Sequence, residues 1–213
     1  MARVFVLTAE EDQATGGGEH LQSTISALRI HLADSSHALA LPPERTLGDE
    51  FQLVSLTPAP IVTACLFLLA EGRWAIGVGI GPGQLAYSPR ASRGPAFVAA
   101  RAAVEAARRR SAVRPIVIHG SDPEGASHAT AIAQALAAFV MQRSAAGHSA
   151  VAAVSAAATQ QAAAHALGIT QQALSQRLTA AHHREVLGLS AVLERGLSAL
   201  DALYRAAERG GGG

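Results

Sequence analysis

The chain lacks several features that would assign it to a class at once. It has one cysteine, Cys65, so no disulfide framework can form within a single chain. The longest apolar run, Ala59 to Ala70, is shorter than the roughly 20 residues that a membrane-spanning helix needs. The apolar segment Arg3 to Leu7 is too short for the core of a secretory signal. We therefore expect a soluble, cytoplasmic protein that does not enter a membrane.

Aromatic residues are also scarce, at 4% of 213 residues, although 49% of the residues are hydrophobic. A chain rich in alanine and poor in aromatic residues builds its cores from Ala, Leu and Val, and its helices pack closely. The length suits one domain of ordinary size followed by a small module.

Acidic residues are missing from Gly125 to Arg184, although the whole chain has a formal net charge of only +1. The same segment contains Arg143, Arg177, Arg184 and five histidines. Carboxylates that face nucleic-acid phosphates would weaken binding, so this distribution favours a phosphate-facing module. The alternative is an alanine-rich segment that simply contains no acids.

The apolar spacing of residues 1–143 predicts an α+β domain. Strands are expected at 3–8, 38–45, 51–56, 74–80 and 114–119, with 84–87 as a hairpin partner of the fourth. Helices are expected at 19–32, from Pro58 or Pro60 to 71, at 95–110 and at 125–143. Pro42 and Pro43 make the second strand an edge strand. We expect one sheet with helices packed on one face.

Residues 144–183 are predicted to form a separate module. Small residues at 144–149 suggest a flexible hinge, and 159–181 has the pattern of a helix-turn-helix. Gly168 stands where two short helices need a tight turn, and Thr170 is placed to cap the second helix. Leu174, Leu178 and Ala181 then form one apolar stripe, which leaves the opposite face of that helix polar.

The polar face predicts contacts with double-stranded DNA. Gln172 and Gln176 have the amide groups that pair with adenine edges, and Arg177 and Arg184 would hold phosphates. The full set of predicted DNA-binding residues is Thr170, Gln171, Gln172, Ser175, Gln176, Arg177, Thr179, His183 and Arg184. Because two arginines per copy give weak binding, we expect a homodimer.

The last helix is expected at 184–209. Its apolar stripe comprises Leu189, Leu193, Leu197, Leu200 and Tyr204. This stripe either packs on the α+β domain or pairs with its copy in a dimer. Residues 210–213 are all glycine and are predicted to be a disordered tail.

Three segments carry a resemblance to a family. Thr46-Leu47-Gly48-Asp49-Glu50-Phe51-Gln52, Ala75 to Gly81, and Gly94 to Phe97 with Ala100-Arg101 resemble the SatD-like bacterial proteins. In that family an α+β domain precedes a C-terminal helix-turn-helix. The same order is similar to the palm domain of diguanylate cyclases, which implies a palm/ferredoxin-like sheet. In those enzymes hairpin carboxylates and a first-strand Asp hold Mg²⁺. Here that strand ends Leu7-Thr8-Ala9, and Glu10, Glu11 and Asp12 are expected to lie past it.

Two features of the α+β domain allow two interpretations each. Asp49 and Glu50 form either a hairpin turn or a candidate ligand site. Gly77, Gly79, Gly81 and Gly83 form either a phosphate cradle or a strand on which a helix packs closely, and we favour the packing.

Together these patterns predict a DNA-binding transcriptional regulator without catalytic residues, metal or cofactor. The α+β domain would act as a sensor of an unknown small-molecule effector or as a dimerisation platform. The alternatives are a nucleotide-processing palm enzyme and a scaffold whose helical module binds protein.

Overall fold

The structure is a computed structural model that describes residues 1–11, 20–109 and 115–210, with the backbone alone for 203–210. Its five strands form one sheet in the order β2-β3-β1-β4-β5. The strands are β1 (Ala2–Glu11), β2 (Leu39–Arg45), β3 (Glu50–Ser55), β4 (Trp74–Gly83) and β5 (Ile116–His119). The first four are antiparallel neighbours in the order of a ferredoxin-like β-α-β-β-α-β unit, and β5 is added parallel to β4. The predicted α+β class is confirmed, and β2 is an edge strand.

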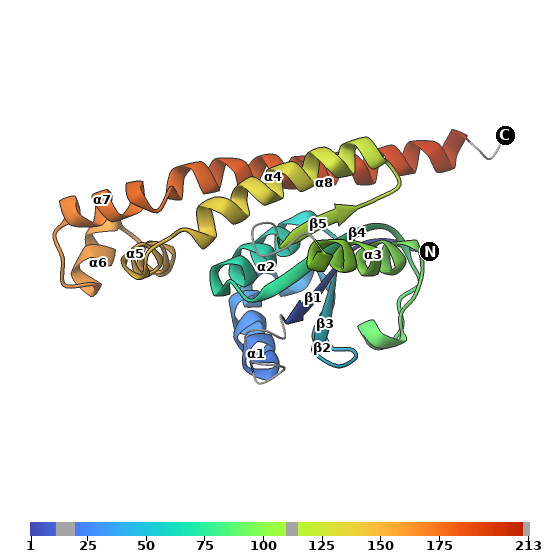
Figure 1. Cartoon of the computed structure of the whole chain (residues 1–213), viewed down its shortest axis with the longest axis horizontal. Coiled ribbons are helices and arrows are strands. Elements are labelled where there is room, and N and C mark those ends of the chain that lie inside the picture. The colour runs from blue at the N-terminus through green and yellow to red at the C-terminus, as the bar shows by residue number, and fades with distance from the viewer. Residues whose placement is uncertain (12–19, 110–114, 211–213) are drawn as a thin grey trace.

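The helices connect the strands and then continue beyond the sheet (Figure 1). They are α1 (Leu21–His31), α2 (Pro58–Glu71), α3 (Pro95–Arg109), α4 (Pro123–Met141), α5 (Ala145–Ala156), α6 (Gln160–Ala166), α7 (Gln171–Ala180) and α8 (His183–Gly210), with short 3-10 turns at Ala33–Ala38 and Pro89–Ala91. Among these described helices none has the length and apolar character to cross a membrane.

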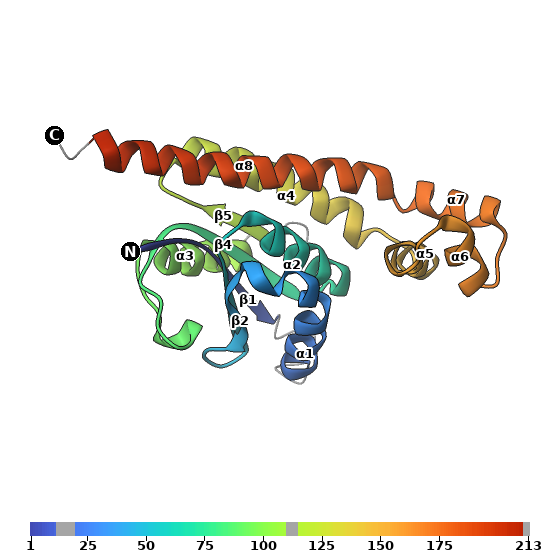
Figure 2. The same cartoon turned by 180° about the vertical axis from the view of Figure 1, so that it is seen from behind.

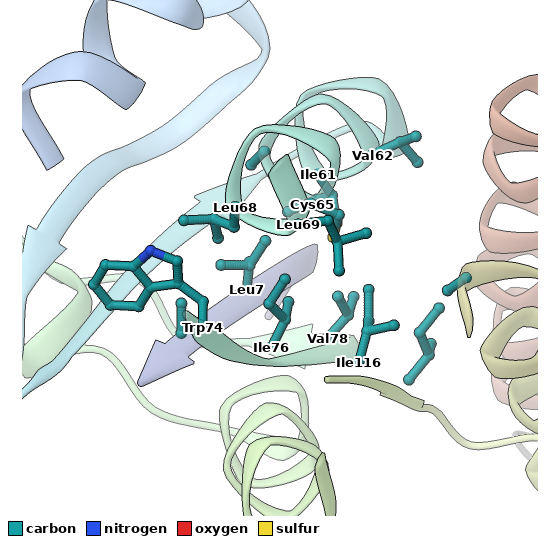
Figure 3. Packing of buried hydrophobic residues seen from close by; sticks show 14 of the residues in the cluster. Leu7, Ile61, Val62, Cys65, Leu68, Leu69, Trp74, Ile76, Val78 and Ile116 are labelled. Atoms are coloured by element: carbon teal, nitrogen blue, oxygen red, sulfur yellow. The ribbon is translucent and has the colours of Figure 1, made fainter. Parts of the chain in front are cut away.

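Helices cover both faces of the sheet, so the prediction of helices on one face was wrong. Leu7 of β1 lies in the main core with Leu28 of α1 and Leu68 of α2. The next side chain along the strand, Val6, points the other way and packs with Ala100 of α3. The parallel strands β4 and β5 need a crossover connection, and α3 crosses the second face because Gly77 and Gly79 leave room there for its backbone. Figure 3 shows α2 side chains of the main core above the strands.

The contact between β4 and α3 is made by backbone. A Cβ on Gly77 would lie 2.2 Å from the nitrogen of Val104, and one on Gly79 would lie 2.1 Å from the carbonyl oxygen of Ala96. The space above these glycines is therefore filled by the helix. Close helix packing is confirmed, and the phosphate-cradle interpretation of Gly77 and Gly79 was wrong.

Strand β4 is longer than predicted, and 84–87 does not form its hairpin partner. Beyond Gly79, β4 pairs with β1 alone, so Pro82 lies in a part of the strand with one free side, where a missing N–H is tolerated. Gln84 instead forms an isolated bridge with Arg93.

Side chains from α4 cover the outer edge of β5. The Thr130 hydroxyl accepts a hydrogen bond from the Ile118 nitrogen at 3.0 Å and donates one to its carbonyl oxygen at 3.2 Å. The Gln134 amide donates to the Ile116 carbonyl oxygen at 3.3 Å. At the opposite edge, β2 contains Pro42 and Pro43 and has two register irregularities.

Helix α8 runs along α4 and returns from the far end of the molecule to the sheet (Figures 1 and 2). Leu193, Leu197 and Leu200 are buried in the main core, which confirms that the stripe packs on the α+β domain. The side chain of Tyr204 and residues 211–213 lie outside the described residues. Gly210 belongs to α8 in the structure, so the predicted tail begins too early there.

Candidate nucleic-acid interface

The turn between α6 and α7 forms as its sequence predicted. Gly168 has a φ of +63°, a conformation that glycine adopts without steric cost. The Thr170 hydroxyl accepts a hydrogen bond from the Ala173 nitrogen at 3.1 Å and caps α7. The Ile169 nitrogen donates to the Ala164 carbonyl oxygen at 3.0 Å, which closes the end of α6. Local signals therefore fix the start of α7.

Helices α5, α6 and α7 form what we call the trihelical module (residues 145–180). Its core is small and consists of Ala150, Ala163, Ala164, Leu174 and Leu178. The alanines allow the helices to approach closely, and the two leucines turn one face of α7 inward. The other face of α7 is left at the surface.

The structure places seven of the nine predicted DNA-binding residues on α7 or its N-cap, whereas His183 and Arg184 begin α8 beyond the corner. Thr170, Gln171, Gln172, Ser175, Gln176, Thr179 and Arg184 are exposed, whereas Arg177 and His183 are partly buried. Because there is no Asp or Glu from Gly125 to Arg184, the module itself carries no carboxylate side chain. The next acid along the chain is Glu185, which is exposed in the first turn of α8. The module lies at one end of the long axis, beyond the sheet (Figure 1).

The predicted hinge at 144–149 was wrong, because this segment begins α5. The Ser144 hydroxyl accepts a hydrogen bond from the Gly147 nitrogen at 3.2 Å and caps the helix. A Cβ on Gly147 would lie 3.2 Å from Cβ of Ala181. The small residues therefore serve a helix cap and a close contact between α5 and the end of α7.

Arg143 has a structural role that sequence reasoning did not detect. Its Nε donates a hydrogen bond to the Ala181 carbonyl oxygen at 3.0 Å, at the end of α7. Burial lowers the pKa of Arg143 and, together with the charge of Arg143, lowers the pKa values of His148 and His183. These two histidines are therefore neutral at pH 7, so His183 contributes no positive charge there. No spacing rule could reveal a contact across 38 residues.

A second contact holds the corner between α7 and α8, which comprises Ala181 and His182. His182 has a φ of +51°, a left-handed conformation that is uncommon outside glycine. Its ring lies against Phe139 of α4, with centroids 4.8 Å apart. Two contacts thus hold the corner. Phe139 in the last turn of α4 packs on His182, and Arg143, just after the end of α4, donates a hydrogen bond to Ala181. The end of α4 therefore contacts the corner that follows α7, in addition to the packing of α7 itself on α5, α6 and α8.

The other predicted site, at Asp49 and Glu50, divides into a turn and an ion pair between a buried carboxylate and a half-exposed arginine. Gly48 has a φ of +57° in the turn, and the Asp49 carbonyl oxygen accepts a hydrogen bond from the Glu11 nitrogen. Glu50 is 4% exposed, accepts a hydrogen bond from Thr46 at 2.6 Å and pairs with Arg101 of α3.

Glu10 and Glu11 lie within β1, so their expected position past the strand was wrong; Asp12 lies outside the described residues. Glu10 stands directly opposite Glu50 and pairs with Arg108 at 2.9 Å. Both facing carboxylates are thus neutralised by arginines of α3. Within the described residues no group of three or more His, Cys, Asp or Glu side chains is placed to hold a metal ion.

Comparisons of the chain with family profiles, with curated proteins and with solved structures find no match, so the resemblance described above stays a prediction.

Proposed function

We propose that the protein binds double-stranded DNA and reads the major groove with α7, as a transcriptional regulator. The observation that carries the proposal is the exposed polar face of α7, presented by a module that has no carboxylate side chain. In helix-turn-helix proteins the second helix enters the groove and the first crosses the backbone, and α7 and α6 have this order. A surface without acids avoids repulsion from phosphates.

The exposed side chains suggest a division of roles. Gln172 and Gln176 lie one turn apart on α7 and would pair with adenine edges. Ser175 and Thr179 would contact a base or the backbone, and Arg177 and Arg184 would contact phosphates. In this proposal Thr170 and Gln171, at the start of α7, meet the groove first.

The α+β domain would serve as sensor or dimerisation platform, in a homodimer located in the cytoplasm. We favour this role over a nucleotide-processing enzyme because Glu10 and Glu50 each already pair with an arginine. The positive charge of the arginine competes with a metal ion for the carboxylate and so opposes a metal site there.

The direct test is selection of bound duplexes from a random library by the full chain, followed by affinity measurement on the selected site. Loss of Gln172 and Gln176, each changed to Ala, should cost about 1–3 kcal/mol per adenine contact. Gln22→Ala, an exposed glutamine on α1, is the matched control and should bind like the unaltered protein. No enrichment at low salt would contradict the proposal.

The salt dependence tests the phosphate contacts and the dimer together. Two arginine contacts per copy give a slope of log K against log salt concentration of about −1.8 for a monomer and about −3.6 for a dimer. Arg184→Ala should reduce the slope by about 0.9 per copy. Arg109→Ala, an exposed arginine on α3, should leave it unchanged.

A further inference from the structure

A cavity of about 930 Å³ that is open to solvent lies at the carboxyl end of β5, between α3 and α4. In Figures 1 and 2 these two helices lie on opposite sides of β5. The floor is formed by Val117 and Ile118, and the walls come from the first turns of each helix. Ligand cavities of about 300–1,000 Å³ enclose small molecules, so the size fits one such ligand.

The two walls of the cavity, on α3 and on α4, have the same spacing of lining residues. On α3 the lining residues are Pro95, Val98, Ala99 and Ala102, and on α4 they are Pro123, Ala126, Ser127 and Thr130. Each set has the spacing i, i+3, i+4, i+7, so each is one face of a helix. The strand between them holds these faces apart, and their small side chains leave the space unfilled. The cavity therefore follows from the packing of the fold.

The lining also restricts the chemistry of the ligand. His119 is the one lining residue with an ionisable side chain, and none is Asp, Glu, Lys or Arg. A fully charged ligand would therefore be desolvated without a permanent countercharge, which is costly. Most of the lining is apolar, and the exposed Ser127 hydroxyl lies at the α4 wall. An uncharged, mainly apolar molecule with one hydrogen-bonding group fits this surface.

Helix α4 connects the cavity with the corner between α7 and α8. The first two turns of α4 line the cavity, its last turn carries Phe139 against His182, and Arg143 follows directly. A helix of 19 residues is about 28 Å long and moves as one body unless it bends. A shift of α4 caused by a ligand would therefore change its contacts with Ala181 and His182, the corner that joins α7 to α8.

We propose that this cavity binds a small uncharged apolar molecule, and that its occupancy changes the position of α7 through α4. The regulatory part rests on the proposed function, because it matters only if α7 binds DNA. The binding part stands independently of it.

The first experiment titrates the full chain with N-phenyl-1-naphthylamine, a neutral aromatic probe that fluoresces in apolar surroundings. We expect saturable binding of one probe per chain. Ala102→Trp and Ser127→Trp fill the cavity from opposite walls, and each should weaken probe binding by about tenfold or more. Ala131→Trp, exposed on α4 outside the cavity, is the control and should bind as before.

A new tryptophan can prevent folding, so two variants are used instead of one. The folding of each variant is checked by its thermal melting curve. If either variant melts like the unaltered chain and still binds the probe with unchanged affinity, the cavity is not the site. Absence of any saturable signal from the unaltered chain would also overturn the proposal.

The second experiment measures backbone hydrogen exchange with and without saturating probe, in the absence of DNA. We expect exchange in the segment 177–186 to change by about threefold, while α1 remains unaffected. Unchanged exchange in 177–186 would overturn the regulatory part. Failure of the chain to bind any duplex would overturn the proposed function and leave probe binding intact, so the two failures are distinguishable.

Discussion

The α3–β4 contact and the trihelical module both rely on small residues, but these residues face different neighbours. At Gly77 and Gly79 the neighbour is the backbone of α3, which can give way only if the helix itself shifts. In the module, Ala150, Ala163 and Ala164 pack against side chains, including Leu174 and Leu178. The sheet domain is therefore intolerant of added atoms, whereas the module depends on a few leucines. Stability should be concentrated in the first region, and the proposed activity lies in the second.

The substitution Gly79→Ala is the most severe test of the difference between the α3–β4 contact and the trihelical module. The new Cβ would lie 2.1 Å from the Ala96 carbonyl oxygen and 2.3 Å from the Ala100 nitrogen, so α3 would have to leave the sheet. We expect the free energy of unfolding to fall by about 3 kcal/mol or more, measured by urea denaturation. The control is Gly188→Ala, which meets nothing within 4 Å on α8 and should raise stability by about 0.5–1 kcal/mol. Equal stability of the two variants would contradict the backbone contact.

Leu174→Ala should damage the module and spare the sheet. It removes the largest buried contact of α7 and should cost about 2–5 kcal/mol, seen as faster hydrogen exchange in α6 and α7. Leu187→Ala changes an exposed leucine of α8 and serves as the matched control.

The rate at which the Cys65 thiol reacts reports on opening of the sheet domain, because Cys65 lies in its main core. Burial raises the pKa of its thiol to about 12, so it should react with thiol reagents only when the main core opens. We expect Leu174→Ala to leave the rate of Cys65 labelling unchanged and Gly79→Ala to raise it. A labelling rate that rises equally in both variants would show that the two regions unfold as one.

A smaller effect is expected at the start of α7. Thr170→Val removes the hydroxyl that accepts the Ala173 hydrogen bond and should cost about 1 kcal/mol. The measurement is hydrogen exchange in the first turn of α7. Thr170→Ser retains a hydroxyl and should restore most of the protection; if it does not, the cap is not the cause.

The smallest predicted effect is on the pH dependence of the module. Burial and the Arg143 charge lower the pKa of His148 below its ordinary value of 6.5. At pH values around and just below 6.5 the unfolded chain therefore binds more protons than the folded chain. Stability is therefore fully present above about pH 6.5 and decreases as the pH falls below it. His148→Gln should flatten this decrease in thermal melting curves. His128→Gln, an exposed histidine on α4, should not.

Sequence predicted the elements whose signals are local. Gly168, Thr170 and the leucines of α7 lie within one turn or two of the features that they determine, and the structure has each of them as expected. The same holds for Gly72 at the end of α2, and of the two prolines expected to start that helix the structure has Pro58.

The errors arise where a distant segment decides the conformation. Glu10 lies in β1 because β3 and β4 pair with that strand as far as its end. Small residues at 144–149 suggested a hinge, yet Gly147 is small because Ala181 approaches it. The contact of Arg143 with the corner depends on the whole path from α4 to α8. None of these contacts leaves a periodic pattern in the sequence.

The treatment of the two sheet edges has a consequence for crowded conditions. An exposed edge strand invites a strand from another chain, which is the usual first step of aggregation. Here Thr130 and Gln134 occupy the outer hydrogen-bonding groups of β5, and Pro42 and Pro43 interrupt those of β2. Neither edge of the described sheet therefore offers a long row of free backbone groups. This protection matters for a chain whose mean hydropathy is as high as +0.22. We infer that copies of this protein do not grow into extended sheets when concentrated.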